Sequence, residues 1–172
     1  MSTLNINQHS LREAKAFLLD MDGTFYIGDG LLPGALELLD LLNQHGLPFC
    51  FLTNNTSRSK QDYIQRLRGL GVRAQDARVY TAGDATIAYL KKHQAGKKVF
   101  LLGTKSLAES FRVGGIYLSD DDPDVVVIGY DTSLTYARLS AFCRFVRSGL
   151  PYIATHPDVN CPDPDGPVPD IG

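Results

Sequence analysis

Short apolar runs alternate with amphipathic segments along this chain of 172 residues. The first run, residues 16–19, is continuous, which is typical of a strand buried on both faces of a parallel sheet. Strands that alternate with helices predict a mainly parallel sheet with right-handed crossover connections. The pattern therefore predicts an α/β, Rossmann-like fold whose strands cover residues 16–19, 49–52, 78–80, 98–102, 125–128 and 152–155.

The helices between these strands carry their own start signals. Ser59 with Asp62 three residues later resembles a capping box, and Thr81 with Asp84 repeats the pattern. After Ser133, apolar residues recur at helical spacing and predict a face that packs on the sheet, formed by Leu139, Phe142, Cys143 and Val146. Prolines are frequent from residue 156 onward, so the tail is predicted to be loop.

Composition and charge narrow the class of protein. A net charge of −2 supplies no basic field, so no nucleic-acid partner is expected. No apolar run is long enough to span a bilayer, so no membrane partner is expected either. The 3 cysteines are an odd count without metal-like spacing, which is typical of reduced thiols. Together these features predict a soluble cytoplasmic protein.

Polar residues follow the first two strands at the point where each ends. Asp20 and Asp22 follow the run at 16–19, and residues 53–55 follow the run at 49–52. In open α/β sheets, reactive groups gather beyond the carboxyl ends of the strands. If these two strands are neighbours, one crevice therefore receives both sets of side chains.

The residue types in that crevice predict a particular chemistry. Two adjacent carboxylates repel by about 4 kcal/mol at about 4 Å and an effective dielectric of about 20, so a site that keeps both ionised needs a cation, and magnesium is favoured. Gly23 and Thr24 are expected to leave main-chain N–H groups free for an anion. Thr53, Asn54 and Asn55 add a hydroxyl and amides. This combination predicts a site for phosphoryl transfer.

The same residues bear on several other interpretations. An acid–x–acid–glycine string taken alone is more often a solvated turn, and the residues at 53–55 alone favour turn and helix-cap roles. A calcium-binding EF-hand loop needs glycine at its sixth position and glutamate at its twelfth, where this chain has Phe25 and Leu31. A Walker-type phosphate loop is excluded because its glycine–lysine pattern does not occur.

Two strings in their order make a family resemblance specific. "LLDMDGTFYIGDGLLPGALELLDLL" followed by "FLTNNTSRS" resembles the haloacid dehalogenase superfamily, and within it the NagD-like, p-nitrophenylphosphatase-type branch. The resemblance covers nearly the whole chain. It implies a magnesium-dependent phosphatase that hydrolyses a small phosphorylated metabolite, such as a sugar phosphate or nucleotide, through an aspartyl-phosphate intermediate.

The resemblance also implies roles for individual residues. Asp20 would be the nucleophile, and Asp22 would be the general acid that later acts as a base. The side chain of Asp20 and the main-chain carbonyl of Asp22 would hold Mg²⁺. Thr53 and the amide of Asn54 would bind phosphoryl oxygens, a role that the residue types extend to Gly23 and Asn55. Residues 25–30 would form a flap beside the nucleophile.

The same resemblance implies two domains. Residues 1–82 would form the N-terminal part of the core, and residues 83–172 an α/β cap with a substrate-specificity loop at residues 154–166. In that loop Asp158 fits the family pattern, whereas His156 stands where the family usually has asparagine. Both are candidate substrate contacts, although the sequence favours a surface-loop histidine at position 156.

The sequence departs from the family in its last part. After Thr155 it has no lysine, and Asp170 is followed by only two residues, so the lysine and the final acidic pair of the family have no counterpart. Because such groups are commonly worth a few kcal/mol each, the 172-residue chain alone is expected to turn over little substrate. The expectation is a fragment of a phosphatase. The alternatives are a short form that only binds a phospho-ligand, or a subunit completed by another chain. An unpaired first strand would favour homo-oligomers.

Overall fold

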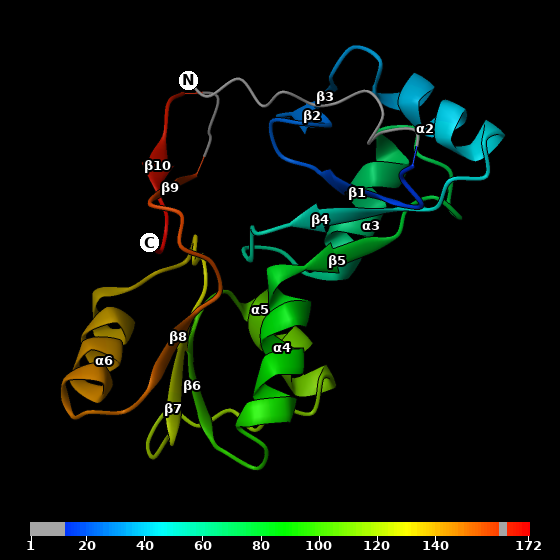
Figure 1. Cartoon of the computed structure of the whole chain (residues 1–172). Helices are drawn as coiled ribbons and strands as arrows, with labels where there is room; N and C mark the ends of the chain where they lie inside the picture. Colours follow the sequence, from blue (N-terminus) through cyan, green and yellow to red (C-terminus); the bar gives the residue numbers. More distant parts are fainter. Residues whose placement is uncertain (1–12, 162–164) are drawn as a thin grey trace.

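The computed structural model describes residues 13–161 and 165–172, and it contains two small parallel sheets (Figure 1). In the first, β1 (Phe17–Asp20), β4 (Phe49–Thr53) and β5 (Val79–Thr81) lie in the order β1-β4-β5. Phe17 pairs with Phe49 and Asp20 with Leu52, in parallel register. The predicted α/β class and its parallel pairing are therefore confirmed.

Helices α2 (Ala35–Gln44) and α3 (Lys60–Gly69) enclose the core of the first sheet. Phe51, at the centre of β4, is fully buried, and its ring makes an edge contact with Phe25 at a centroid distance of 4.8 Å. Leu39 of α2 and Leu67 of α3 belong to the same buried cluster. This core supports the ends of β1 and β4, which carry the candidate site residues.

The second sheet is covered on both faces. It contains β6 (Val99–Leu102), β7 (Val125–Ile128) and β8 (Tyr152–Ala154), all parallel and in that order. One face packs on α4 (Ala82–His93) and α5 (Lys105–Val113). The other face packs on α6 (Tyr136–Arg147). Val125, Val126 and Val127 are completely buried because each face of the central strand is covered.

Two short hairpins complete the described structure. The first joins β2 (Tyr26–Ile27) to β3 (Gly30–Leu31) directly after β1. The second joins β9 (Asn160–Cys161) to β10 (Val168–Pro169) in the proline-rich tail. The prediction that the tail is entirely loop is wrong, because β9 and β10 form a short antiparallel pair there. In the described part of the chain, the longest helices have 12 residues, and none has the length and apolarity of a membrane span.

Both predicted capping boxes are confirmed. At the start of α3, the Ser59 hydroxyl accepts from the Asp62 N–H, while the Asp62 carboxylate accepts from the Ser59 N–H. Thr81 and Asp84 make the same reciprocal pair at the start of α4. These bonds depend only on residues three apart, which is why the sequence sufficed to predict them.

Two burial predictions are wrong. β1 lies at the edge of its sheet, and Leu18 is 69% exposed, so the strand is not buried on both faces. On α6, Leu139 and Cys143 are exposed, while Phe142 and Val146 pack partly against the second sheet. An apolar run indicates whether an element is a helix or a strand. It does not show which other parts of the protein cover each face of that element.

The two sheets have separate buried clusters, and a hydrogen bond between a side chain and the main chain links the loops that follow β4 and β7. The Thr56 hydroxyl, after β4, accepts a 2.7 Å hydrogen bond from the Tyr130 N–H, after β7. A Cβ at Gly129 would lie 2.7 Å from Leu107 Cδ2 and 2.9 Å from the Thr56 hydroxyl oxygen, so a larger residue there would force its neighbours to shift. The division into a core part at 1–82 and a cap at 83–172 stays a proposal.

Candidate active site

The two candidate acids lie where the sequence predicts, at the carboxyl end of β1. Asp20 is the last residue of β1, and Thr53 is the last residue of the neighbouring β4. Because these strands run parallel with Asp20 opposite Leu52, their carboxyl ends meet at one edge of the sheet. The structure therefore brings the segments that contain Asp20 and Thr53 together, as the sequence predicts.

The turn after Asp20 orients the carboxylate but leaves few free donors. The Thr24 hydroxyl donates a 2.8 Å hydrogen bond to Asp20 Oδ2. The Gly23 N–H donates to the Tyr26 carbonyl at 2.9 Å, and the Thr24 N–H donates to the Met21 carbonyl at 3.2 Å. The expectation that Gly23 and Thr24 offer free N–H groups is wrong, because the tight turn uses both. Gly23 instead serves the turn through its positive φ of 80°.

Asp22 occupies a more enclosed position than Asp20. Its Oδ2 atom is buried and has no hydrogen-bond partner among the described residues. Burial raises the pKa of Asp22 above its ordinary value, with a further contribution from the neighbouring charge of Asp20, while Arg66, Tyr26 and Arg58 oppose the shift. A carboxyl whose pKa is raised is better suited to donate a proton, which is the role of a general acid.

The raised pKa of Asp22 makes stability depend on pH. A carboxyl with a raised pKa stabilises the fold fully at low pH, and this stabilisation is lost as pH rises through the folded-state pKa. We therefore expect Asp22→Asn to have a larger free energy of unfolding than the parent at about pH 8, and this difference to shrink towards about pH 4. Urea denaturation with a metal chelator measures this. A variant no more stable than the parent at the higher pH would contradict it.

Arg66 on α3 holds the β2–β3 hairpin beside Asp22, and no sequence motif points to this residue. Its guanidinium donates to the Gly28 carbonyl, lies 3.4 Å from Asp29 Oδ1 and stacks over the Tyr26 ring at 4.7 Å. Burial and the neighbouring Asp22 carboxylate raise the pKa of Tyr26 to about 12, so its hydroxyl keeps its proton. Residues 25–30, which were expected to form a flap, thus belong to a hairpin that packs on α3.

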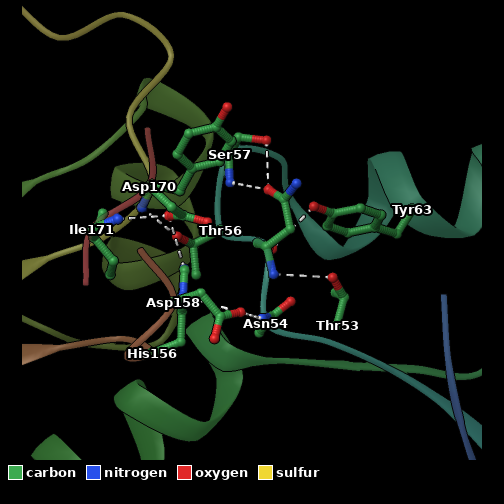
Figure 2. Close-up of polar contacts among 11 residues, drawn as sticks. Thr53, Asn54, Thr56, Ser57, Tyr63, His156, Asp158, Asp170 and Ile171 are labelled. Carbon is green, nitrogen blue, oxygen red and sulfur yellow. Dashed lines mark hydrogen bonds and ion pairs between the residues drawn. The ribbon is translucent and has the colours of Figure 1, made fainter. Parts of the chain in front are cut away.

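The loop after β4 is rigid through its own hydrogen bonds. Thr53, 5% exposed, accepts a 3.1 Å bond from the Asn55 N–H through its hydroxyl oxygen. Asn55 Oδ1 accepts from the Ser57 N–H at 2.9 Å, and the Tyr63 hydroxyl donates to the Asn55 carbonyl at 3.0 Å (Figure 2). The Asn55 side-chain oxygen therefore shapes the turn, which was the alternative that its residue type favoured.

Asn54 contacts the tail instead of its own loop. Its side-chain Nδ2 donates to Asp158 Oδ2, although the two residues are far apart in the sequence (Figure 2). His156, two residues earlier, is only 7% exposed, so the expectation of a surface-loop histidine is wrong. Asp170, which the sequence did not single out, lies 3.4 Å from His156 Nε2. The tail thus brings two of the predicted cap residues to the loop after β4.

The acids at the end of β1 fit a hard divalent cation. The donors implied for it are the Asp20 carboxylate, whose Oδ2 also accepts from the Thr24 hydroxyl, and the main-chain carbonyl of Asp22. Hard divalent cations take oxygen ligands, and a small set of protein oxygens leaves the remaining positions to water. In the described part of the chain, no group of three or more His, Cys, Asp or Glu side chains forms a closed metal cage.

Paired acids at the end of one parallel strand and a threonine–asparagine loop at the end of its neighbour are the architecture that the resemblance implies. A family model described as haloacid dehalogenase-like hydrolase matches residues 17–117, which include both features. The chain belongs to this family.

Individual relatives place the chain more narrowly. The acid sugar phosphatase of Staphylococcus aureus (strain USA300) is 34% identical over 163 residues, covering 94% of this chain and 63% of the relative. The 4-nitrophenylphosphatase structure from Thermotoga maritima has a TM-score of 0.89 and 47% identity, covering 94% of this chain and 62% of that one. NagD from E. coli K-12 has a TM-score of 0.78 and 31% identity, over 90% of this chain and 61% of its own.

These matches confirm the NagD-like, p-nitrophenylphosphatase-type branch that the sequence predicts. The chain spans 63% of the length of the curated relative named above.

Proposed function

We propose that this chain carries the reacting groups of a phosphatase that hydrolyses small phosphate monoesters through an aspartyl-phosphate. The observation that carries the proposal is the placement of Asp20 and Asp22 at the end of β1, beside the end of β4. The names of the relatives, an acid sugar phosphatase and a 4-nitrophenylphosphatase, support a monoester as the substrate class.

The proposed reaction has two displacements. In the first, an oxygen of Asp20 bonds to phosphorus, the bond from phosphorus to the ester oxygen breaks, and Asp22 donates its proton to the leaving alcohol. In the second, Asp22 accepts a proton from water, whose oxygen bonds to phosphorus and releases orthophosphate from Asp20. The enclosed position of Asp22, which raises its pKa, supports the first of these roles.

Other residues would bind and orient the phosphoryl group. Thr53 has a hydroxyl hydrogen available after accepting from Asn55, and Asn54 has a second amide hydrogen after donating to Asp158. Mg²⁺, held by the Asp20 side chain and the Asp22 carbonyl, would neutralise the negative charge that collects at this site. We assign no phosphate contact to Gly23, because its N–H is already used in the turn.

Binding of orthophosphate tests the proposal without requiring turnover. We expect the chain to bind orthophosphate in the presence of Mg²⁺, and Asn54→Ala to weaken this binding about tenfold, because one hydrogen bond to an anion is lost. Isothermal titration calorimetry measures the affinity, and Asn160→Ala, an exposed asparagine in β9, is the matched control. Failure of the parent chain to bind orthophosphate, or equal affinities for both variants, would contradict the proposed phosphate site.

A further inference from the structure

His156 is a buried histidine whose two ring nitrogens each face a carboxylate without forming a hydrogen bond to it. It lies in the segment between β8 and β9, and its side chain is only 5% exposed. Neither Nδ1 nor Nε2 has a hydrogen-bond partner among the described residues. A buried ring nitrogen normally has a partner, so this position needs an explanation beyond packing.

A carboxylate lies on each side of the ring (Figure 2). Asp170 Oδ1 is 3.4 Å from Nε2, and its side chain is as buried as that of His156. Asp158 Oδ2 is 3.9 Å from Nδ1. Burial raises the pKa of Asp170, while the neighbouring His156 opposes this rise. The imidazole therefore connects a buried acid to a more exposed one.

Main-chain bonds hold the two acids in fixed relation. The Gly172 N–H donates to the Asp158 carbonyl at 2.7 Å, and the Asp170 N–H donates to the Val159 carbonyl at 2.9 Å. Asp170 Oδ1 also accepts from the Ile171 N–H at 2.8 Å. The segment after β10 thus runs beside the segment before β9, and Asp170 has little freedom to turn away from His156.

Asp158 links this arrangement to the loop after β4. The same oxygen that faces His156, Oδ2, accepts from Asn54 Nδ2. A carboxylate only accepts, so it fixes the amide nitrogen of Asn54 on its own side. The amide nitrogen has two hydrogens. One is donated to Asp158, and the second points away from Asp158. The orientation of that second donor therefore depends on where Asp158 is held.

We infer that Asp170 is a positioning residue that acts through His156 and Asp158 to orient the Asn54 amide toward a bound phosphoryl group. The inference rests on the proposed function only in giving Asn54 a role in phosphate binding. The effect of Asp170 on the orientation of the Asn54 amide does not depend on that function. A purely structural pair would stabilise the tail and leave the Asn54 amide unchanged. In the inferred role, by contrast, Asp170 contributes to phosphate binding without touching the ligand.

The side-chain amide signals of Asn54 in nitrogen–proton NMR spectra test the orientation directly. We expect Asp158→Asn, at a partly exposed position, to shift these signals, and Asp170→Asn to shift them in the same direction. Asp121→Asn, the same change at an exposed loop residue, should leave them in place. If Asp170→Asn does not fold, Asp170→Glu is measured instead, with a smaller shift expected. Unmoved Asn54 signals in the folded Asp170 variant, or in Asp158→Asn, would overturn the inference.

Orthophosphate titration of the same variants with Mg²⁺ present connects orientation to binding. We expect Asp170→Asn to bind at least about fivefold more weakly than Asp121→Asn, because the Asn54 donor is misdirected. Equal affinities with shifted Asn54 signals would overturn the role in phosphate binding. If the parent chain binds no orthophosphate, the proposed function is contradicted, and the NMR comparison still decides whether Asp170 orients Asn54.

Discussion

Asp20→Asn is expected to reduce phosphatase turnover by at least about 10³-fold, because an amide oxygen does not attack phosphorus as a carboxylate does. The assay uses a chimera in which residues 1–172 replace the matching region of the Thermotoga maritima 4-nitrophenylphosphatase, with which the chain shares 47% identity. This design supplies the part of that relative that the chain does not match. Initial rates with 4-nitrophenyl phosphate and Mg²⁺ give the comparison.

Two measurements separate a missing nucleophile from a damaged fold. Asp121→Asn in the same chimera should retain the parent rate, because Asp121 is exposed in the loop before β7. Trapping the covalent intermediate, followed by mass spectrometry, should locate the phosphoryl group on Asp20 in the parent chimera only. Turnover in Asp20→Asn within about tenfold of the parent would contradict the proposed nucleophile, since loss of a covalent step costs far more.

Leu67→Ala is expected to destabilise the chain by about 2–5 kcal/mol, which is the usual cost of removing a fully buried leucine side chain. Leu67 has no exposed surface and packs in the cluster between α3 and the first sheet. The cost combines the lost burial of the removed atoms with the cavity that they leave. Urea denaturation, followed by circular dichroism, measures the change in the free energy of unfolding.

Leu18→Ala provides a matched control for this prediction. Leu18 is 69% exposed on the edge strand β1, so the same substitution should change stability by no more than about 0.5 kcal/mol. Equal losses for the two variants would show that the uncovered face of β1 is covered in solution. Because an open strand edge favours association, sedimentation of the parent chain would then be measured as well.

Much of the fold was predictable because its causes are local. Four-residue apolar runs specify strands such as β7, and reciprocal bonds between Ser59 and Asp62 specify a helix start. The placement of Asp20 at the end of β1 follows from the same run, and parallel pairing brings it to the edge where β4 ends. The family matches support this assignment of the fold over residues 17–117.

The site was predictable only in part, because hydrogen-bond partners depend on neighbours in space. The acids at 20 and 22 are visible as a motif, but the use of the Gly23 N–H inside the turn depends on the hairpin that follows. Arg66 and Asp170 carry no local signal, since each acts on residues from a different element. Sequence spacing therefore identified the groups that are proposed to react, but not the residues that contact and orient them.

By itself, the sequence determined the order of the six strands of the two parallel sheets, the two capping boxes and the acids that end β1, because each depends on residues a few positions apart. Only the tertiary structure decided which apolar residues are covered, leaving Leu18 in solvent and enclosing His156 between two carboxylates. The physical reason is that burial is a property of the surfaces that meet. An apolar run at an uncovered sheet edge stays exposed, and a polar loop residue is buried where another segment packs over it.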